Sequence, residues 1–166
     1  AGVKDVMSFD FIEPPSREAM GQAIFSLAAL GALEIPSGAG PGRQPQLTCL
    51  GRDMSTLPLE PMHAKFLIDS EKYSCTKQAL DIAAMLSVES PYFTPRNARQ
   101  EAVDAHKRFA AFDADHLGLM NVYRAFVKVR QDPEWCKASF LKYGTLKKAH
   151  RVRVQLARML APLFPK

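Results

Sequence analysis

Long apolar runs, disulfide-type cysteine patterns and metal-binding motifs are all missing from this chain of 166 residues. No apolar stretch approaches the ~18 residues that a transmembrane helix needs. The three cysteines, Cys49, Cys75 and Cys136, are odd in number, far apart and never in a CxxC pair. This argues against a disulfide framework and a zinc site, and favours packing roles in a reducing compartment. We therefore expect no membrane span, no metal and an intracellular protein.

Motifs for nucleotide hydrolysis and nucleophilic catalysis are also absent. No GxxxxGK[ST], G-x-S-x-G or H-E-x-x-H sequence occurs. The glycine run from Gly38 to Gly42 follows no apolar strand, and Pro41 removes one amide donor. It indicates a flexible loop and not a phosphate cradle. We expect no catalytic residue and no cofactor site within this chain.

One acidic cluster, formed by Asp113, Asp115 and His116, has two interpretations. It is either a metal or acid/base site, or the start of a helix, where carboxylates are favoured by the free amides and the helix dipole. The second arrangement is the commoner one for a D-x-D-H sequence.

Acidic residues are missing from the last part of the chain. Residues 137–166 contain eight Lys and Arg and no Asp or Glu, whereas residues 1–136 contain 14 basic and 17 acidic residues. The net charge of +5 is therefore concentrated at one end. Such a concentration indicates an anionic partner, most commonly a nucleic acid.

Proline is scarce in the second half, which can therefore hold long helices. Seven of the twelve prolines lie from Pro36 to Pro95, and Pro133 alone falls between residues 96 and 161. In the first half, Ser16 is placed to cap a helix that ends near Gly31. A loop over Pro36–Pro45, a short strand over Gln46–Leu50 and a turn at Gly51-Arg52 complete a small winged-helix unit.

Six helices are expected after residue 59, which makes an α-helical bundle. The first begins at Pro61, and Thr76 and Thr145 are placed to cap two of the others. A short helix that begins at Trp135 is expected to end near Gly144, and the last helix near Ala161. The predicted inward positions repeat at helical spacing: Ala79, Ile82, Ala83, Leu86, Ala102, Ala105, Phe109, Phe112, Leu119, Val122, Phe126 and Val129.

The last helix is amphipathic, with a basic stripe. Lys147, Arg151 and Arg158 fall within about 40° of one another at 3.6 residues per turn, and Gln155 lies beside them. The stripe suits contact with a phosphate backbone, and its alternative is an ordinary solvated helix face. The absence of Asp and Glu from residues 137–166 favours contact with phosphate over an ordinary solvated face. The opposite face is apolar: Ala149, Val152, Leu156, Leu160 and Leu163.

Eight short segments occur in a distinctive order along the chain: Phe9–Pro15, Leu30–Leu33, Leu47–Met54, Leu57–Pro61, Asp115–Leu117, Asn121–Tyr123, Trp135–Cys136 and Val152–Leu156. In this order they resemble the C-terminal region of DEAH-box RNA helicases over nearly the whole chain. The resemblance implies a mainly α fold, with a winged-helix domain at residues 1–58 and a ratchet-like helical bundle at 59–166.

What the resemblance implies is an accessory module and not a motor. In that family two RecA-like domains bind ATP and Mg²⁺, an OB-fold usually follows, and single-stranded RNA passes between the domains. The chain is then a fragment of a nuclear helicase active in RNA processing such as mRNA splicing. A G-patch-type activator or spliceosome or ribosome-assembly proteins are the implied protein partners.

The resemblance and the basic stripe together suggest a set of RNA-contacting residues. These are Arg151, Arg153, Gln155, Lys147 and Arg158, with Asn121 and His116 as further candidates. Arg153 is the motif residue of the resemblance, yet the helical wheel turns it toward the apolar flank. It either contacts RNA or braces a neighbouring helix.

Two other functions stay open. The chain is alternatively a protein-interaction scaffold without RNA contact, in which the basic helix packs against absent domains. A sequence-specific DNA-binding winged helix is the third reading. It lacks a basic recognition helix after Gly31, because that segment is rich in Gly and Pro.

Overall fold

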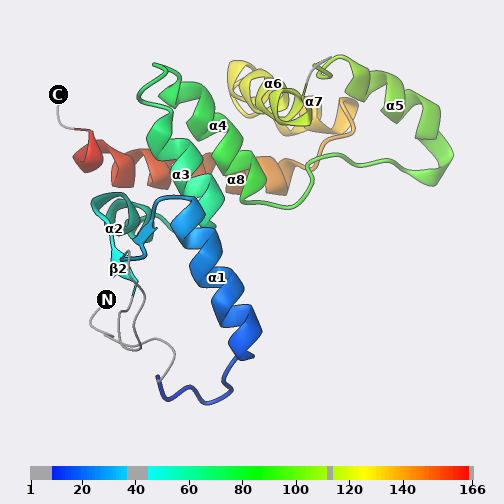
Figure 1. Ribbon diagram of the computed structural model, residues 1–166. Coiled ribbons are helices and arrows are strands. Elements are labelled where there is room, and N and C mark those ends of the chain that lie inside the picture. The colour runs from blue at the N-terminus through cyan, green and yellow to red at the C-terminus, as the bar shows by residue number, and fades with distance from the viewer. Residues whose placement is uncertain (1–8, 37–44, 112–113, 165–166) are drawn as a thin grey trace. The chain divides into compact units, whose positions relative to one another are not determined.

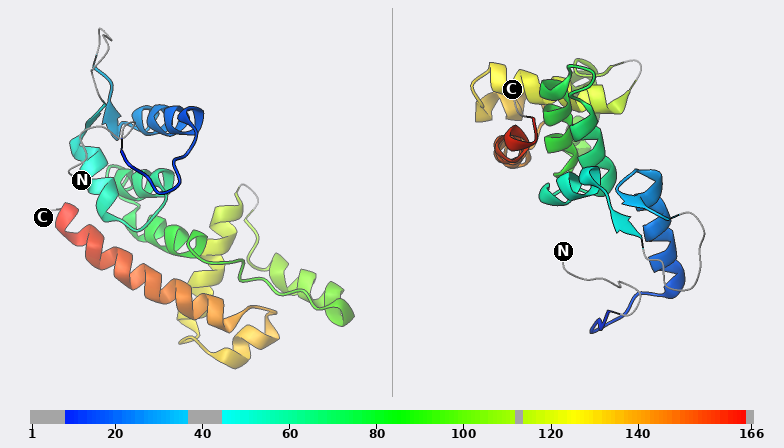
Figure 2. Two further views of the ribbon diagram at one scale, coloured as in Figure 1. Left: turned by 90° about the horizontal axis from the view of Figure 1, so that it is seen from below. Right: turned by 60° about the vertical axis from the view of Figure 1, so that its left-hand side comes forward.

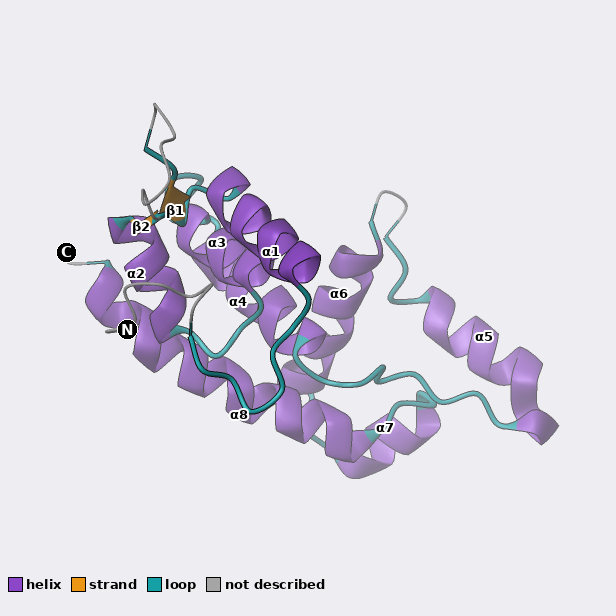
Figure 3. Ribbon diagram, turned by 60° about the horizontal axis from the view of Figure 1, so that its bottom comes forward, coloured by secondary structure: helices purple, strands orange, loops and turns teal. Residues whose placement is uncertain are grey.

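The computed structural model describes residues 9–36, 45–111 and 114–164. It is built mainly of helices, with one two-stranded sheet (Figure 1, Figure 3). The chain separates into two compact units, Ala1–Lys65 and Phe66–Lys166. None of the described helices has the length and apolar character to cross a bilayer.

The first unit begins with α1 (Arg17–Ala29), as predicted. The Oγ of Ser16 accepts a hydrogen bond from the backbone N–H of Ala19 at 3.1 Å and so caps the helix. After the helix, Gly31 adopts a φ of 75°, a conformation that favours glycine and reverses the chain. No residue of α1 is buried.

Two very short strands follow α1 and pair antiparallel. They are β1 (Leu33–Glu34) and β2 (Gln46–Leu47), with Leu33 opposite Leu47. Of the loop predicted for Pro36–Pro45, residues 37–44 lie outside the described residues. The winged-helix assignment of this unit stays a prediction.

The strand predicted over Gln46–Leu50 ends at Leu47, and the turn predicted at Gly51-Arg52 is wrong. Helix α2 (Cys49–Thr56) follows instead. The reason is Thr48, whose hydroxyl accepts from the backbone N–H of Gly51 at 2.9 Å and donates to the carbonyl of Gly31 at 2.7 Å. A β-branched residue that favours strands thus acts as a helix cap.

Replacing this cap is expected to loosen α2. Thr48→Ala removes both hydroxyl hydrogen bonds and should cost about 1 kcal/mol of local stability. Hydrogen exchange of the α2 amides measures the loss, and Thr48→Ser, which keeps the hydroxyl, is the matched control. Equal exchange rates in the two variants would show that the hydroxyl does not hold the helix start.

Most of the predicted bundle lies in the second unit. The described residues after 59 form six α-helices: α3 (Pro61–Asp69), α4 (Thr76–Leu86), α5 (Arg99–Lys107), α6 (Asp115–Lys128), α7 (Pro133–Ala138) and α8 (Tyr143–Leu160). Short 3₁₀ turns precede α5 at Arg96–Ala98 and follow α8 at Ala161–Leu163. The α3 helix spans the division between the two units.

Several predicted helix ends are wrong. Thr76 and Thr145 are not caps: Cys75 and Lys142 hold those positions without side-chain hydrogen bonds. The α7 helix ends at Ala138, and the chain turns through Phe140 at a φ of 53°. Gly144 is therefore the second residue of α8, where a glycine lowers helix stability but is tolerated.

Helices α4, α6 and α8 pack together around the core, with α8 alongside α4 (Figure 2). The small side chains of Ala79, Ala83 and Ala84 are fully buried, which lets α4 lie close to its partners. Of the predicted inward positions, Phe112 lies outside the described residues, and Leu86, Ala105, Leu119 and Val129 are half-buried. The rest are buried: Ala79, Ile82, Ala83, Ala102, Phe109, Val122 and Phe126.

The cysteines differ in their environments. Cys136 is fully buried in the core, and burial, with the charge of Asp132, raises its pKa to about 11. Its thiol is therefore a packing group. Cys75 is half-buried, but Cys49 is exposed at the start of α2, so its predicted packing role is wrong. Its sulfur accepts a hydrogen bond from Arg52 at 3.2 Å.

Candidate nucleic-acid interface

The basic stripe of α8 points to solvent. Lys147, Arg151, Gln155 and Arg158 are all exposed, while Ala149, Leu156 and Leu160 on the other side of the helix are buried. Among the described residues, no carboxylate lies within ion-pair distance of the three cations. Their positive charge is therefore available to an anionic ligand.

One member of the stripe is held by an aromatic ring. The Nζ of Lys147 lies 5.5 Å from the centroid of the Tyr143 ring, one turn earlier in α8. This cation–π contact steadies the long side chain at little cost to its exposure. The Tyr143 ring is itself fixed edge-on against Phe126 in the core, with 6.2 Å between ring centroids.

Arg153 braces a neighbouring helix, as the helical wheel allowed. Its Nε donates to Oδ1 of Asp81 on α4 at 2.5 Å, and only 27% of its side chain is exposed. Arg124 of α6 donates through Nε to the other oxygen, Oδ2, at 3.0 Å. The Asp81 side chain is 6% exposed, so a buried carboxylate ties α4, α6 and α8 together.

An aromatic pair lies beside this ion pair. The Arg153 guanidinium carbon is 5.9 Å from the centroid of the Tyr123 ring, and the Tyr123 hydroxyl is 2.8 Å from Nδ1 of His150. Burial raises the pKa of Tyr123, Arg153 lowers it and Asp81 raises it again. The net shift is upward, so the hydroxyl keeps its proton at neutral pH.

The two further RNA candidates lie on α6. The Nδ2 of Asn121 donates to the carbonyl of Phe109 at 3.2 Å, so this amide fastens α6 to the segment after α5. His116 is exposed in the first turn of α6. Neither residue belongs to the α8 stripe.

The described part of the acidic cluster forms the start of a helix, which is the second of its two interpretations. Asp115 and His116 are exposed in the first turn of α6, while Asp113 lies outside the described residues. Among the described residues, no group of three His, Cys, Asp or Glu side chains is arranged to hold a metal.

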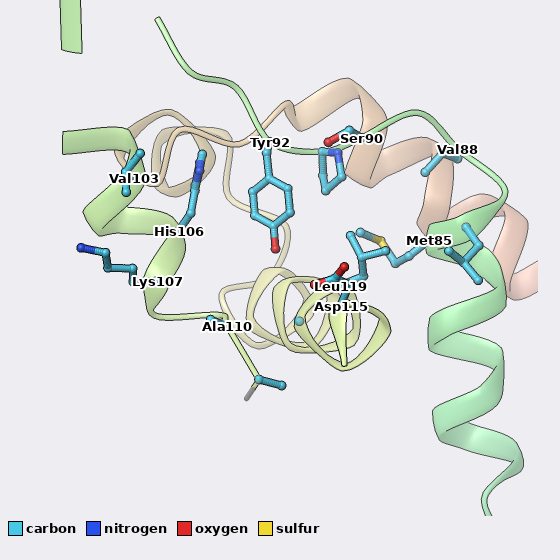
Figure 4. Close-up of a pocket in the computed structure, with 14 residues that line it drawn as sticks. Met85, Val88, Ser90, Tyr92, Val103, His106, Lys107, Ala110, Asp115 and Leu119 are labelled. Carbon is cyan, nitrogen blue, oxygen red and sulfur yellow. The ribbon is translucent and has the colours of Figure 1, made fainter. Parts of the chain in front are cut away.

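A cavity of about 550 Å³ lies between the end of α4, the following loop, α5 and α6 (Figure 4). Its walls are mostly apolar, with Met85, Val88 and Leu119 among them, and the hydroxyl of Tyr92 points toward α6. Burial and the nearby charge of Asp115 raise the pKa of Tyr92. Sequence reasoning missed this cavity because its lining comes from separate segments.

Sequence reasoning also missed Asp81, Arg124 and His150. One signal was present, although helical spacing alone places Asp81 opposite the predicted inward stripe of α4: the run ALDIAAML is otherwise apolar on all sides of the helix, which is typical of a buried helix. A charge at such a position requires a partner of opposite sign. The pattern does not reveal which of the 22 basic residues supplies it.

A protein-family comparison finds a similarity for the middle part of the chain. Residues 60–119 match the helicase associated domain (HA2), ratchet-like. This segment runs from just before α3 into α6 and so includes Asp81 and all the residues that line the cavity. This part of the chain is therefore similar to a ratchet-like helicase-associated domain.

Two curated relatives are similar over nearly the whole chain. Both are described as "Probable ATP-dependent RNA helicase DHX35", one from Homo sapiens and one from Pongo abelii. Each is 37% identical over 160 residues, which is 96% of this chain but 22% of the human protein and 21% of the orangutan protein. The chain thus spans about a fifth of the length of these relatives.

Proposed function

We propose that this chain is a C-terminal accessory module of an ATP-dependent DEAH-box RNA helicase, and that it helps to grip single-stranded RNA during translocation or remodelling of RNA–protein complexes. The similarity to DHX35 over 96% of the chain supports the helicase class. The observation that carries the gripping role is the exposed stripe of Lys147, Arg151 and Arg158 on α8, with no opposing carboxylate among the described residues.

The stripe suits RNA contact that does not depend on sequence. Ammonium and guanidinium groups bind the phosphate backbone, which every nucleotide shares. Gln155 beside them offers an amide to phosphate or ribose. A translocating enzyme benefits from such contacts because it does not stall at particular bases.

The other components of the proposal belong to the longer protein. Its RecA-like domains would bind ATP and Mg²⁺, and an OB-fold would complete the RNA path. The residues 1–58 would form a winged-helix domain and the residues 59–166 the ratchet-like bundle. The proposal includes a nuclear location, a role in RNA processing such as mRNA splicing, and activation by a G-patch-type or assembly protein.

RNA binding of the chain tests the gripping role. Fluorescence anisotropy with a labelled oligouridylate of about 12 nucleotides should show weak, salt-sensitive binding. A chain carrying Lys147→Gln, Arg151→Gln and Arg158→Gln should bind about tenfold more weakly, and the slope of log K against log salt should fall by about 2, since each single-strand phosphate contact accounts for about 0.7.

A charge-matched control separates the stripe from general attraction. Lys77→Gln, Lys128→Gln and Lys137→Gln remove the same charge from exposed positions outside α8 that, like the stripe, have no ion-pair partner among the described residues. Equal loss in the two triple variants, or no RNA binding by the unaltered chain at low salt, would contradict the gripping role. In the longer helicase, the α8 substitutions should also lower RNA-stimulated ATP hydrolysis.

The protein-interaction scaffold is the second candidate, and one observation favours it. Helix α1 buries none of its residues, and Phe25 on it is 72% exposed. Apolar side chains exposed in this way suit a protein partner. Partners that are recovered after nuclease treatment, together with an absence of RNA crosslinks to α8, would favour this function over RNA gripping.

A further inference from the structure

We propose that Arg124 and Arg153, held together by the buried Asp81, form a second phosphate-binding site for single-stranded RNA, separate from the α8 stripe. This inference rests on the proposed function, because it assigns an additional contact to the same ligand. The three residues come from α6, α8 and α4.

The charges at this site do not cancel. Asp81 supplies one negative charge and the two guanidiniums supply two positive charges, and each arginine pairs with Asp81. Among the described residues, no other carboxylate lies within ion-pair distance of Arg124 or Arg153. The group therefore keeps one net positive charge in a partly dehydrated position, where it attracts an anion strongly.

The hydrogen-bond donors are also incompletely used. A guanidinium has five N–H donors, and both arginines reach Asp81 through Nε. Within the described part of the chain, both residues donate hydrogen bonds through Nε and not through a terminal amine. The two Nε atoms bind the two oxygens of one carboxylate, so the two guanidiniums are neighbours and their terminal amines remain as donors for a phosphate.

The pair is fixed before a ligand arrives. Asp81 is 6% exposed and orients both guanidiniums, and the Tyr123 ring, with its centroid 5.9 Å from the Arg153 guanidinium carbon, supports one of them. Tyr123 is in turn hydrogen-bonded to His150. Binding to prearranged arginines loses little side-chain entropy. Arg124 is 47% exposed, which leaves the site open to solvent.

The position of the pair makes it distinct from the stripe. Arg153 is about 120–160° around α8 from Lys147, Arg151 and Arg158 at 100° per residue. A phosphate held by the pair is therefore not the phosphate held by the stripe. If both sites bind one strand, the RNA contacts the bundle at two separated phosphates.

Arg124→Gln is the informative change. It removes the more exposed guanidinium and leaves Arg153 paired with Asp81, so the fold should persist. With the labelled oligouridylate, we expect affinity to fall about threefold to tenfold and the salt slope to fall by about 0.7, the value of one single-strand phosphate. Arg124→Lys should keep the salt slope, because lysine keeps the charge. It should lose part of the RNA affinity, because lysine lacks the paired N–H donors of the planar guanidinium.

Lys137→Gln on α7 is the matched control for loss of one exposed charge. If Arg124→Gln changes the salt slope no more than Lys137→Gln does, the pair is a structural ion pair and the inference is wrong. If the α8 triple variant still weakens RNA binding in that case, the proposed function stands without the second site. If the unaltered chain binds no RNA, both proposals fail.

Discussion

Asp81→Ala is expected to destabilise the second unit by about 2–3 kcal/mol. The substitution leaves Arg124 and Arg153 side by side without their shared carboxylate. Removing one partner of a fully buried ion pair costs about 3–5 kcal/mol, and the cost is smaller here because both guanidiniums are partly in water. Loss of the carboxylate also removes the hydrogen bonds that link α4 to α6 and α8. The packing of these helices forms the core.

Urea unfolding followed through Trp135 measures this loss, since it is the single tryptophan of the chain and lies in the second unit. Asp104→Ala is the control: Asp104 is exposed and pairs with Lys107 on the same helix at 2.7 Å. Its removal should leave the unfolding midpoint unchanged. Identical midpoints for the two variants would mean that the buried carboxylate does not hold the three helices.

Gly51→Ala is expected to destabilise α2 by about 2–3 kcal/mol, although alanine is the better helix former. A Cβ on Gly51 would overlap the carbonyl oxygen of Ala32 and stand 2.9 Å from its carbonyl carbon and 2.8 Å from Cδ1 of Leu47. Two of these three atoms are backbone, so the helix has to move away. That movement would also lengthen the hydrogen bond from Gly51 to Thr48.

Gly21→Ala provides the opposite result as a control. Gly21 lies in the middle of α1, and no described atom lies within 4 Å of where its Cβ would be. We expect this change to stabilise α1 by about 0.5–1 kcal/mol through helix propensity alone. Hydrogen exchange of the α1 and α2 amides compares the two variants. Slower exchange of α2 in Gly51→Ala would overturn the packing argument.

Local patterns predicted much of the fold. The apolar spacing in residues 76–86 and 115–128 identified α4 and α6, and Ser16 and Gly31 marked the two ends of α1. These signals are local, because helix periodicity and capping depend on residues within a few positions of one another. Short strands and turns were less predictable. Thr48 favours a strand by its shape, yet its hydroxyl bonds to Gly31, which is distant in sequence.

The candidate site also has a part that local sequence predicts and a part that only the tertiary structure decides. Lys147, Arg151 and Arg158 share one face of a single helix, so the sequence by itself determined the stripe and the concentration of charge that suggests an anionic ligand. The ion pair of Arg153 was decided by the tertiary structure alone, because its partner Asp81 lies 72 positions earlier in the chain. Which helices meet depends on packing between distant segments, and no periodicity within either segment records that pairing.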